Sequence, residues 1–173
     1  MGKTMDKKYV DSLLCKISHG DNEAFEELYI RTRKGVFSFL YSYFDNYHDT
    51  EDAMKSVYLK IKRSIHTYQK GTNGTAWILQ IAKNHALTEL RKNKATVGLD
   101  EIPEVSYEFE YNSITDVMRR VLGDDEQRIV TLHVLWNYKH REIAQILGIP
   151  LGTVTSKFNR AIGKLKEALK DVK

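Results

Sequence analysis

The stretch HREIAQILGIPLGTVTSKFNRAIGKL, residues 140–165, decides how the C-terminal part of the chain folds. Ala144 and Gly148 are four residues apart, and Val154 follows six residues after the glycine. This spacing predicts a helix-turn-helix, because the small residue lets two helices cross closely, the glycine makes the turn and the branched residue packs the second helix back. Pro150 suits the start of the second helix, where no N–H is needed.

A helical wheel of residues 151–169 separates an apolar face from a polar one. The apolar face comprises Leu151, Val154, Phe158, Ala161, Ile162, Leu165 and Leu169. The opposite face comprises Gly152, Ser156, Asn159, Arg160 and Gly163, flanked by Thr155 and Lys157. Short polar groups, an amide and a guanidinium suit base edges and phosphates in a major groove, so the pattern favours DNA binding. The ordinary wet face of an amphipathic helix is the alternative.

The N-terminal part of the chain also has helical apolar spacing. Gly20 ends a first helix, and Asp21 is a good N-cap for a second one. We expect a third helix to open at Asp49 and a fourth to cover residues 75–94. Neither a convincing strand pattern nor an internal repeat is found in the sequence.

A further set of helices is expected before and within the helix-turn-helix. Apolar residues between 114 and 122 predict a helix that Gly123 stops. Asp124 and Asp125 are expected to cap another helix that runs through Trp136, and two shorter helices close the chain. The sequence therefore predicts an all-α protein, with helical domains over 1–95 and 112–173 and a linker over 96–111.

Charge follows the same division. The formal net charge is +4, and it is distributed as +5 over residues 1–95, −5 over 96–111 and +4 over 112–173. Basic blocks attract phosphate backbones, although solvated lysines on ordinary helices give the same totals.

A single cysteine, Cys15, excludes an internal disulfide framework and a Cys-rich metal site. With no apolar run of membrane-spanning length and no leader, we expect a soluble, cytoplasmic protein without membrane insertion.

The fourth predicted helix carries an aromatic residue on its polar face. Away from its apolar stripe lie Trp77, Gln80, Asn84, Thr88 and Arg91. A large aromatic among amides and a guanidinium is the combination that stacks on unpaired bases and reads them. Packing of Trp77 against the preceding loop, Tyr68 included, is the alternative.

The third predicted helix has a leucine on its polar, outer face. Asp52, Ser56, Leu59 and Arg63 line the face away from its apolar side. Leu59 either marks a contact with another protein or is one of the isolated leucines that any surface carries.

These segments, in this order, resemble the extracytoplasmic-function group of bacterial RNA polymerase sigma factors, in the sigma-70 family. Residues 21–44, DNEAFEELYIRTRKGVFSFLYSYF, look like the first part of region two of that family, and DTEDAMKSVYLKI (49–61) looks like its polymerase-binding helix. TAWILQIAKNHALTELRK (75–92) is similar to the stretch that melts and reads the minus-ten element. Residues 124–165 look like region four, which binds the minus-thirty-five element.

The resemblance implies a function and a set of partners. Such proteins bind core RNA polymerase, direct it to particular promoters and help to open the duplex, without a cofactor and commonly under the restraint of an anti-sigma factor. The polymerase-binding residues would be Asp49, Asp52, Ser56, Leu59 and Arg63. The residues at the single-stranded minus-ten element would be Lys70, Asn73, Trp77, Gln80, Asn84, Thr88 and Arg91. Those at the duplex minus-thirty-five element would be Thr155, Ser156, Lys157, Asn159 and Arg160. The acidic linker would lie in the RNA path.

Three other classes of function compete with this interpretation, one of which, a two-domain adaptor that binds only proteins, makes poor sense of Arg160 and the open recognition face. An enzyme is disfavoured because the six histidines are scattered without ligand spacing, and GTNG (71–74) is too short for a phosphate loop. His85, beside the apolar stripe, is expected to be a packed or capping histidine, and His133 to be semi-buried. The remaining class is a stand-alone helix-turn-helix regulator, whose N-terminal bundle would sense a signal or dimerise.

Overall fold

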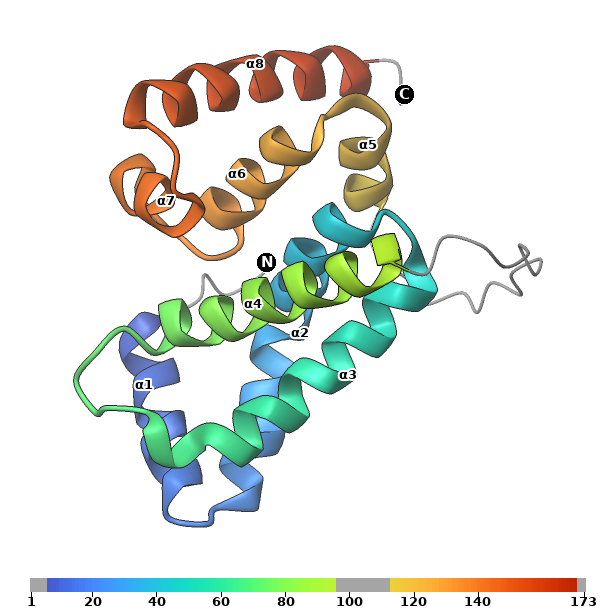
Figure 1. Cartoon of the computed structure of the whole chain (residues 1–173). Helices are drawn as coiled ribbons and strands as arrows, with labels where there is room; N and C mark the ends of the chain where they lie inside the picture. Colours follow the sequence, from blue (N-terminus) through green and yellow to red (C-terminus); the bar gives the residue numbers. More distant parts are fainter. Residues whose placement is uncertain (1–5, 96–112, 171–173) are drawn as a thin grey trace. The chain divides into compact units, whose positions relative to one another are not determined.

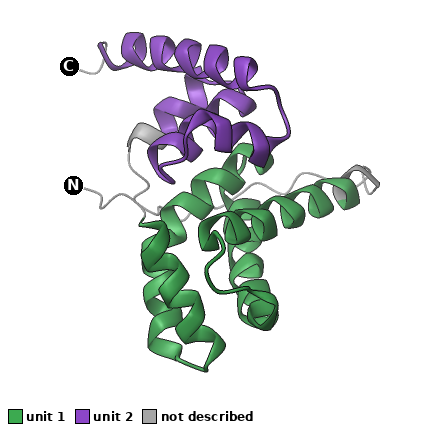
Figure 2. Ribbon diagram, turned by 90° about the vertical axis from the view of Figure 1, so that its left-hand side faces the viewer, with its two compact units in different colours: residues 1–106 green, residues 107–173 purple. Residues whose placement is uncertain are grey.

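The chain folds into two helical units, residues 1–106 and 107–173 (Figure 2). This computed structural model describes residues 6–95 and 113–170, and the predicted linker over 96–111 lies outside the described residues. Within the described ranges every regular element is a helix and none is a strand (Figure 1). The all-α prediction is therefore confirmed.

The first unit is built from four α-helices and one short 3-10 turn. They are α1 (Lys7–Ser18), α2 (Asn22–Phe44), α3 (Tyr47–Ser64), η1 (Ile65–Thr67) and α4 (Gly74–Ala95). The long helix α2 packs against the other three α-helices, and α4 also packs against both α1 and α3. Leu14, Leu28, Val57, Ile61 and Ile78 are completely buried where these helices meet. Burying apolar side chains from all four helices makes this unit one core.

Most predicted boundaries in this unit are confirmed, and one is wrong. The first helix ends at Ser18, just before Gly20 with its φ of +88°, and Oδ1 of Asp21 accepts from the Ala24 N–H at 3.0 Å. The third helix begins at Tyr47 rather than Asp49. Oδ1 of Asn46 caps it by accepting from the Asp49 N–H at 2.8 Å, and an asparagine in extended backbone serves as well there as an aspartate.

The second unit contains α5 (Ser113–Val121), α6 (Asp124–Val134), α7 (His140–Leu147) and α8 (Leu151–Lys170). The last helix packs against the other three. Met118, Leu122, Val130, Ala161 and Leu165 form one buried cluster. At 20 residues α8 is one of the longest helices, so the expectation that two shorter helices close the chain is wrong for α8 and correct for the 8-residue α7.

Two further expectations for this unit are corrected. Helix α6 ends at Val134, because Trp136 turns inward to full burial and Asn137 adopts a positive φ of 54°. The side chain that caps the start of α6 is that of Glu126, whose carboxylate accepts a hydrogen bond from the Gly123 N–H at 3.1 Å. The sequence had assigned this cap to Asp124 and Asp125. On α8 the two ends of the predicted apolar face project into solvent, with Leu151 44% and Leu169 45% exposed.

Candidate nucleic-acid interfaces

The turn between α7 and α8 has the geometry that the sequence predicts. Gly148 has a φ of +71°, and its N–H donates to the carbonyl oxygen of Ala144 at 2.9 Å. A left-handed residue at this position ends the helix without the strain that a Cβ would add. Ile143 and Val154, one from each helix, are completely buried. The helix-turn-helix is therefore held by a glycine turn and a shared apolar core.

The predicted DNA face of α8 is open over most of its length. Thr155, Ser156, Asn159 and Arg160 are all exposed. The hydroxyl of Thr155 lies 3.3 Å from Nδ1 of His140, at the start of α7. Gly152 and Gly163 are also exposed, and a Cβ added at either would meet no atom within 4 Å. Polar side chains separated by positions without side chains leave this face free to approach a flat or grooved partner closely.

Lys157 differs from its neighbours because it is engaged within the unit. Its ammonium donates to Oδ2 of Asp125, and Oδ1 of the same carboxylate accepts from Arg128 at 3.1 Å. These hydrogen bonds, that of Lys157 first, hold the pKa of Asp125 below its usual range. A phosphate contact by Lys157 would therefore have to compete with this pair.

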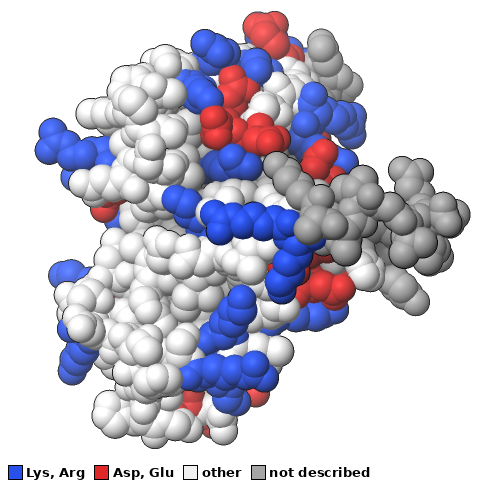
Figure 3. All heavy atoms as spheres, in the orientation of Figure 1, with Lys and Arg blue, Asp and Glu red and all other residues white. Residues whose placement is uncertain are grey.

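A second pair joins the same two helices. Nζ of Lys164 lies 2.7 Å from Oε2 of Glu126, a carboxylate only 8% exposed. Burial acts to raise the pKa of Glu126, but the hydrogen bonds from Lys164 and the Gly123 N–H bring it below its ordinary value. Arg160 lines the same shallow hollow as these residues. Figure 3 shows acidic and basic side chains intermixed on the surface of this unit.

The polar face of α4 is likewise accessible. Gln80, Asn84, Thr88 and Arg91 are exposed, and Nε2 of Gln80 donates to Oδ1 of Asn84 at 2.8 Å. Trp77 is half-buried, with its ring centroid 5.3 Å from that of Tyr68. The alternative contact with the preceding loop is therefore present, and it leaves part of the indole exposed beside the polar row.

The loop before α4 contributes the other two predicted residues. Lys70 and Asn73 are both exposed. Oδ1 of Asn73 accepts from the Ala76 N–H at 3.1 Å and so caps α4. Asn73 thus has a structural role at the helix start, whereas Lys70 lies on the surface of the loop.

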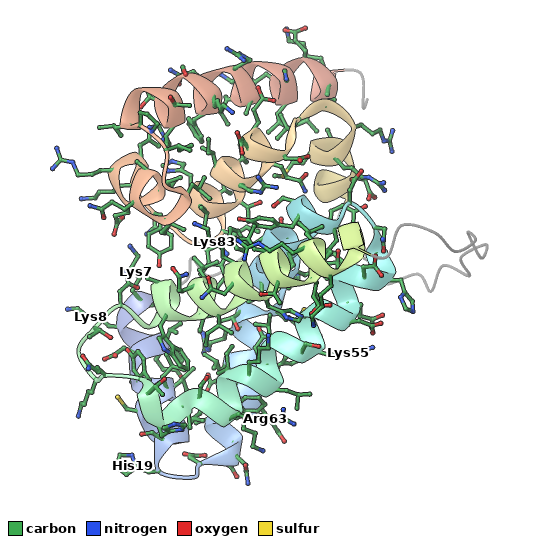
Figure 4. The ribbon with its side chains drawn as sticks, in the orientation of Figure 1. Lys7, Lys8, His19, Lys55, Arg63 and Lys83 are labelled. Atoms are coloured by element: carbon green, nitrogen blue, oxygen red, sulfur yellow. The ribbon has the colours of Figure 1, made fainter. Side chains whose placement is uncertain are left out.

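The predicted contact face of α3 combines charge with one apolar side chain. Leu59 is 55% exposed, Asp49, Asp52 and Arg63 are exposed, and Ser56 is half-buried. Lys55 lies 3.5 Å from Asp52 within the helix, and Figure 4 shows both Lys55 and Arg63 on the outside of α3. A leucine surrounded by charges matches the composition of a protein-contact surface rather than that of a ligand pocket.

The two histidines singled out in the sequence are placed as expected. His85 is buried on α4, with Nδ1 2.9 Å from the ammonium of Lys60. Burial, followed by the charge of Lys60, lowers its pKa. His133 is half-buried and its Nδ1 lies 2.9 Å from the carbonyl oxygen of Tyr138. Neither belongs to a metal cluster, since no group of three or more potential ligands occurs among residues 6–95 and 113–170.

The sequence did not indicate two contacts: that of Asp11 on α1 with the loop before α4, and that of Asp125 on α6 with Lys157. Their partners are 57 and 32 residues away along the chain, so no local pattern signals either contact.

No helix in the described part of the chain is long and apolar enough to cross a membrane.

Comparison with known proteins identifies both units. Residues 28–96 match the family model for sigma-70 region 2, and residues 120–165 match that for sigma-70 region 4. The chain is 24% identical to the ECF RNA polymerase sigma factor SigW of Bacillus subtilis, over 91% of this chain and 95% of that protein. It is also 24% identical to the ECF RNA polymerase sigma-E factor of Escherichia coli, over 91% of this chain and 93% of that one.

Solved structures share the fold. The sigma factor RpoE of Bartonella quintana, in complex with the anti-sigma factor NepR, superposes with a TM-score of 0.64 at 21% identity, covering 84% of this chain and 96% of that chain. CnrH, in complex with the cytosolic domain of CnrY, gives a TM-score of 0.61 at 16% identity, covering 94% of this chain and 98% of that one.

Proposed function

The chain belongs to the extracytoplasmic-function group of the sigma-70 family, and on that premise we propose that it binds core RNA polymerase and directs it to specific promoters. It acts as a non-catalytic initiation factor in the cytoplasm, where the polymerase works. One observation carries the proposal: a single chain presents two open polar faces, on α4 in the region-2 match and on α8 in the region-4 match.

We assign the polymerase contact to α3, where charged residues surround the exposed Leu59. Leu59 supplies the apolar anchor, with Asp49, Asp52, Ser56 and Arg63 around it. An exposed apolar side chain inside a charged ring is the arrangement that makes a protein interface strong at its centre and selective at its rim.

The minus-ten element is assigned to α4 and the loop that precedes it. Trp77 offers an indole face for stacking, Asn84 and Gln80 offer amides to base edges, and Lys70 and Arg91 attract the backbone. Thr88 lies one turn beyond Asn84, near the melted strand. Asn73 keeps the loop joined to α4, and we assign the loop around Lys70–Gly74 to hold a flipped base of the non-template strand. This region takes single-stranded rather than duplex DNA, because stacking on Trp77 requires an unpaired base.

The minus-thirty-five element is assigned to α8, where Thr155, Ser156, Asn159 and Arg160 face the major groove. Lys157 contributes a phosphate contact only by exchanging its bond with Asp125. We also propose an anti-sigma factor as a partner of this chain, because RpoE of Bartonella quintana has a similar fold and is bound to one.

Run-off transcription with purified core polymerase tests the proposal, with a library of promoter fragments as template. Transcription should require the protein, and Asn84→Ala and Arg160→Ala should each reduce it about tenfold, since a good base contact contributes about 1–3 kcal/mol. Asn22→Ala and Arg120→Ala, which alter an exposed amide on α2 and an exposed guanidinium on α5, are the matched controls.

The same templates, footprinted with the protein alone, discriminate against a stand-alone regulator. Such a protein would footprint duplex DNA without polymerase and would leave transcription independent of its presence. That result would remove both the polymerase contact on α3 and the single-strand site on α4 from the proposal.

A further inference from the structure

The connection between η1 and α4, residues 68–73, is fastened to α1; we call it the anchored loop. The hydroxyl of Tyr68 donates to Oδ1 of Asp11, and the N–H of Gly71 donates to the same oxygen at 3.3 Å. One carboxylate of α1 therefore binds both the first residue and the middle of the anchored loop. Figure 1 shows this connection running alongside α1 before it enters α4.

The exit of the anchored loop is also fixed by α1. A Cβ built on Gly74 would lie 2.7 Å from Cδ1 of Leu14 and 3.4 Å from Cα of Asp11. The first residue of α4 and the side of α1 thus meet with no room for a side chain. The same helix therefore bonds to the beginning and the middle of the loop and packs closely against the residue that follows it.

Apart from these bonds, the contacts of the anchored loop are local: Thr72 bonds to the carbonyl oxygen of Gln69, Asn73 caps α4, and the ring of Tyr68 lies beside that of Trp77. The side chains from Gln69 to Asn73 are all exposed, and Gly71 adopts a positive φ of 82°. A segment with exposed side chains samples more conformations when a bond to a neighbouring helix is lost, and each residue that is ordered later costs conformational entropy. Burial, together with the hydrogen bond to Asp11, raises the pKa of Tyr68, so its phenol stays protonated and continues to donate.

We propose that Asp11 is a positioning residue for reading the minus-ten element: it holds the anchored loop in the shape that selects a base next to Trp77. The inference rests on the function proposed above. It goes beyond the family match, because the region-2 model begins at residue 28 and leaves α1 outside. A preorganised loop loses less entropy when it captures a base. Stacking on Trp77 and attraction of the backbone tolerate any sequence, so loosening the loop reduces base discrimination more than total affinity.

The test uses holoenzyme formed from core polymerase and the full chain, with a promoter library randomised over the minus-ten element. The readout is the transcript ratio between the preferred base and the other three at each position, together with the affinity for core polymerase. Asp11→Ala removes the acceptor, Asp11→Asn keeps a carbonyl oxygen in its place, and Tyr68→Phe removes one donor while keeping the ring.

The matched control is Tyr9→Phe. The phenol of Tyr9 also donates to a carboxylate, that of Glu27 at 2.7 Å, but this bond joins α1 to α2 and does not involve the anchored loop. The two tyrosine variants remove the same chemical group from the same unit. They differ in whether the loop is released.

Base discrimination should fall about fivefold at one or more positions with Asp11→Ala and with Tyr68→Phe. Asp11→Asn and Tyr9→Phe should stay within about twofold of the wild type, and affinity for core polymerase should be unchanged. If Asp11→Ala does not fold, the result with Tyr68→Phe decides. Unchanged discrimination with Tyr68→Phe, or an equal loss with Tyr9→Phe, overturns the inference while the proposed function stands. A wild-type protein that supports no transcription overturns both.

Discussion

Alanine substitution at two glycines of the second unit should change its stability in opposite directions. Gly148 ends α7 at a φ of +71°, whereas Gly163 lies inside α8, and in both places a Cβ would meet nothing within 4 Å. A clash with neighbouring atoms therefore plays no part. The backbone conformation at each glycine alone decides whether alanine stabilises or destabilises the unit. This makes the pair a direct test of the turn geometry on which the helix-turn-helix depends.

Gly148→Ala forces a Cβ into the left-handed region, which costs roughly 1–2 kcal/mol. Gly163→Ala adds helix propensity in a helix interior and should stabilise the unit by about 0.5–1 kcal/mol. For a unit of this size each kcal/mol moves the melting temperature by about 4–8 °C. We therefore expect Gly148→Ala to melt roughly 5–10 °C lower than the wild type and Gly163→Ala a few degrees higher.

Thermal unfolding followed by far-ultraviolet circular dichroism and by the fluorescence of Trp136 measures both changes, because Trp136 is completely buried in this unit. The other tryptophan, Trp77, is half-buried in the first unit and reports on that one separately. Equal melting temperatures for Gly148→Ala and the wild type would refute the left-handed turn. A lower one for Gly163→Ala would refute the open position on α8. Gly163→Ala also separates stability from function, since the added methyl projects from the proposed DNA face and should weaken binding to the upstream element.

Three further predictions concern single hydrogen bonds. Asp125→Asn should destabilise the second unit near neutral pH by about 0.5–1 kcal/mol, a small value because that side chain is 44% exposed. The pKa of Asp125 is lowered in the folded state, so its contribution is present above its unfolded pKa and is lost in acid. The difference between variant and wild type in urea titrations should therefore disappear at low pH, and a difference that persists would refute the ion pair with Lys157. Lys60→Met should raise the pKa of His85 in an NMR titration but leave it below its ordinary value, because burial is the larger cause; an unchanged pKa would contradict the contact. Thr32→Val removes a buried hydroxyl that bonds across to α3 at 2.6 Å and should cost about 1–3 kcal/mol in the unfolding of the first unit, whereas a neutral result would place that hydroxyl in contact with water.

Local sequence signals were sufficient for most of the helices. Asp21 was predictable as a cap because its side chain acts within three residues, and Gly148 as a turn because left-handed backbone favours glycine. The start of α3 was misplaced because Asn46 and Asp49 are both good caps, and sequence does not say which adopts the extended backbone. The end of α6 was misplaced because the burial of Trp136 is decided by packing within the whole unit.

The residues of the candidate sites also divide into those that the sequence could predict and those that depend on packing. The exposure of Asn84, Asn159 and Arg160 follows from helical periodicity and could be predicted. The pairing of Lys157 with Asp125 could not, because it depends on how α6 and α8 cross. A wheel shows which way a lysine points, and it does not show which carboxylate a neighbouring helix brings there.

The pairs between α6 and α8 have a consequence for how the free protein moves through the cell. Lys157 and Lys164 are paired with Asp125 and Glu126, so fewer lysines of the second unit are available to DNA phosphates than its sequence contains. Nonspecific affinity for DNA rises steeply with the number of cations available to phosphate. A protein with some of its lysines occupied spends less time stalled on the vast excess of irrelevant genomic sites. Under the proposed function, we therefore expect more of it to stay free in solution to meet polymerase.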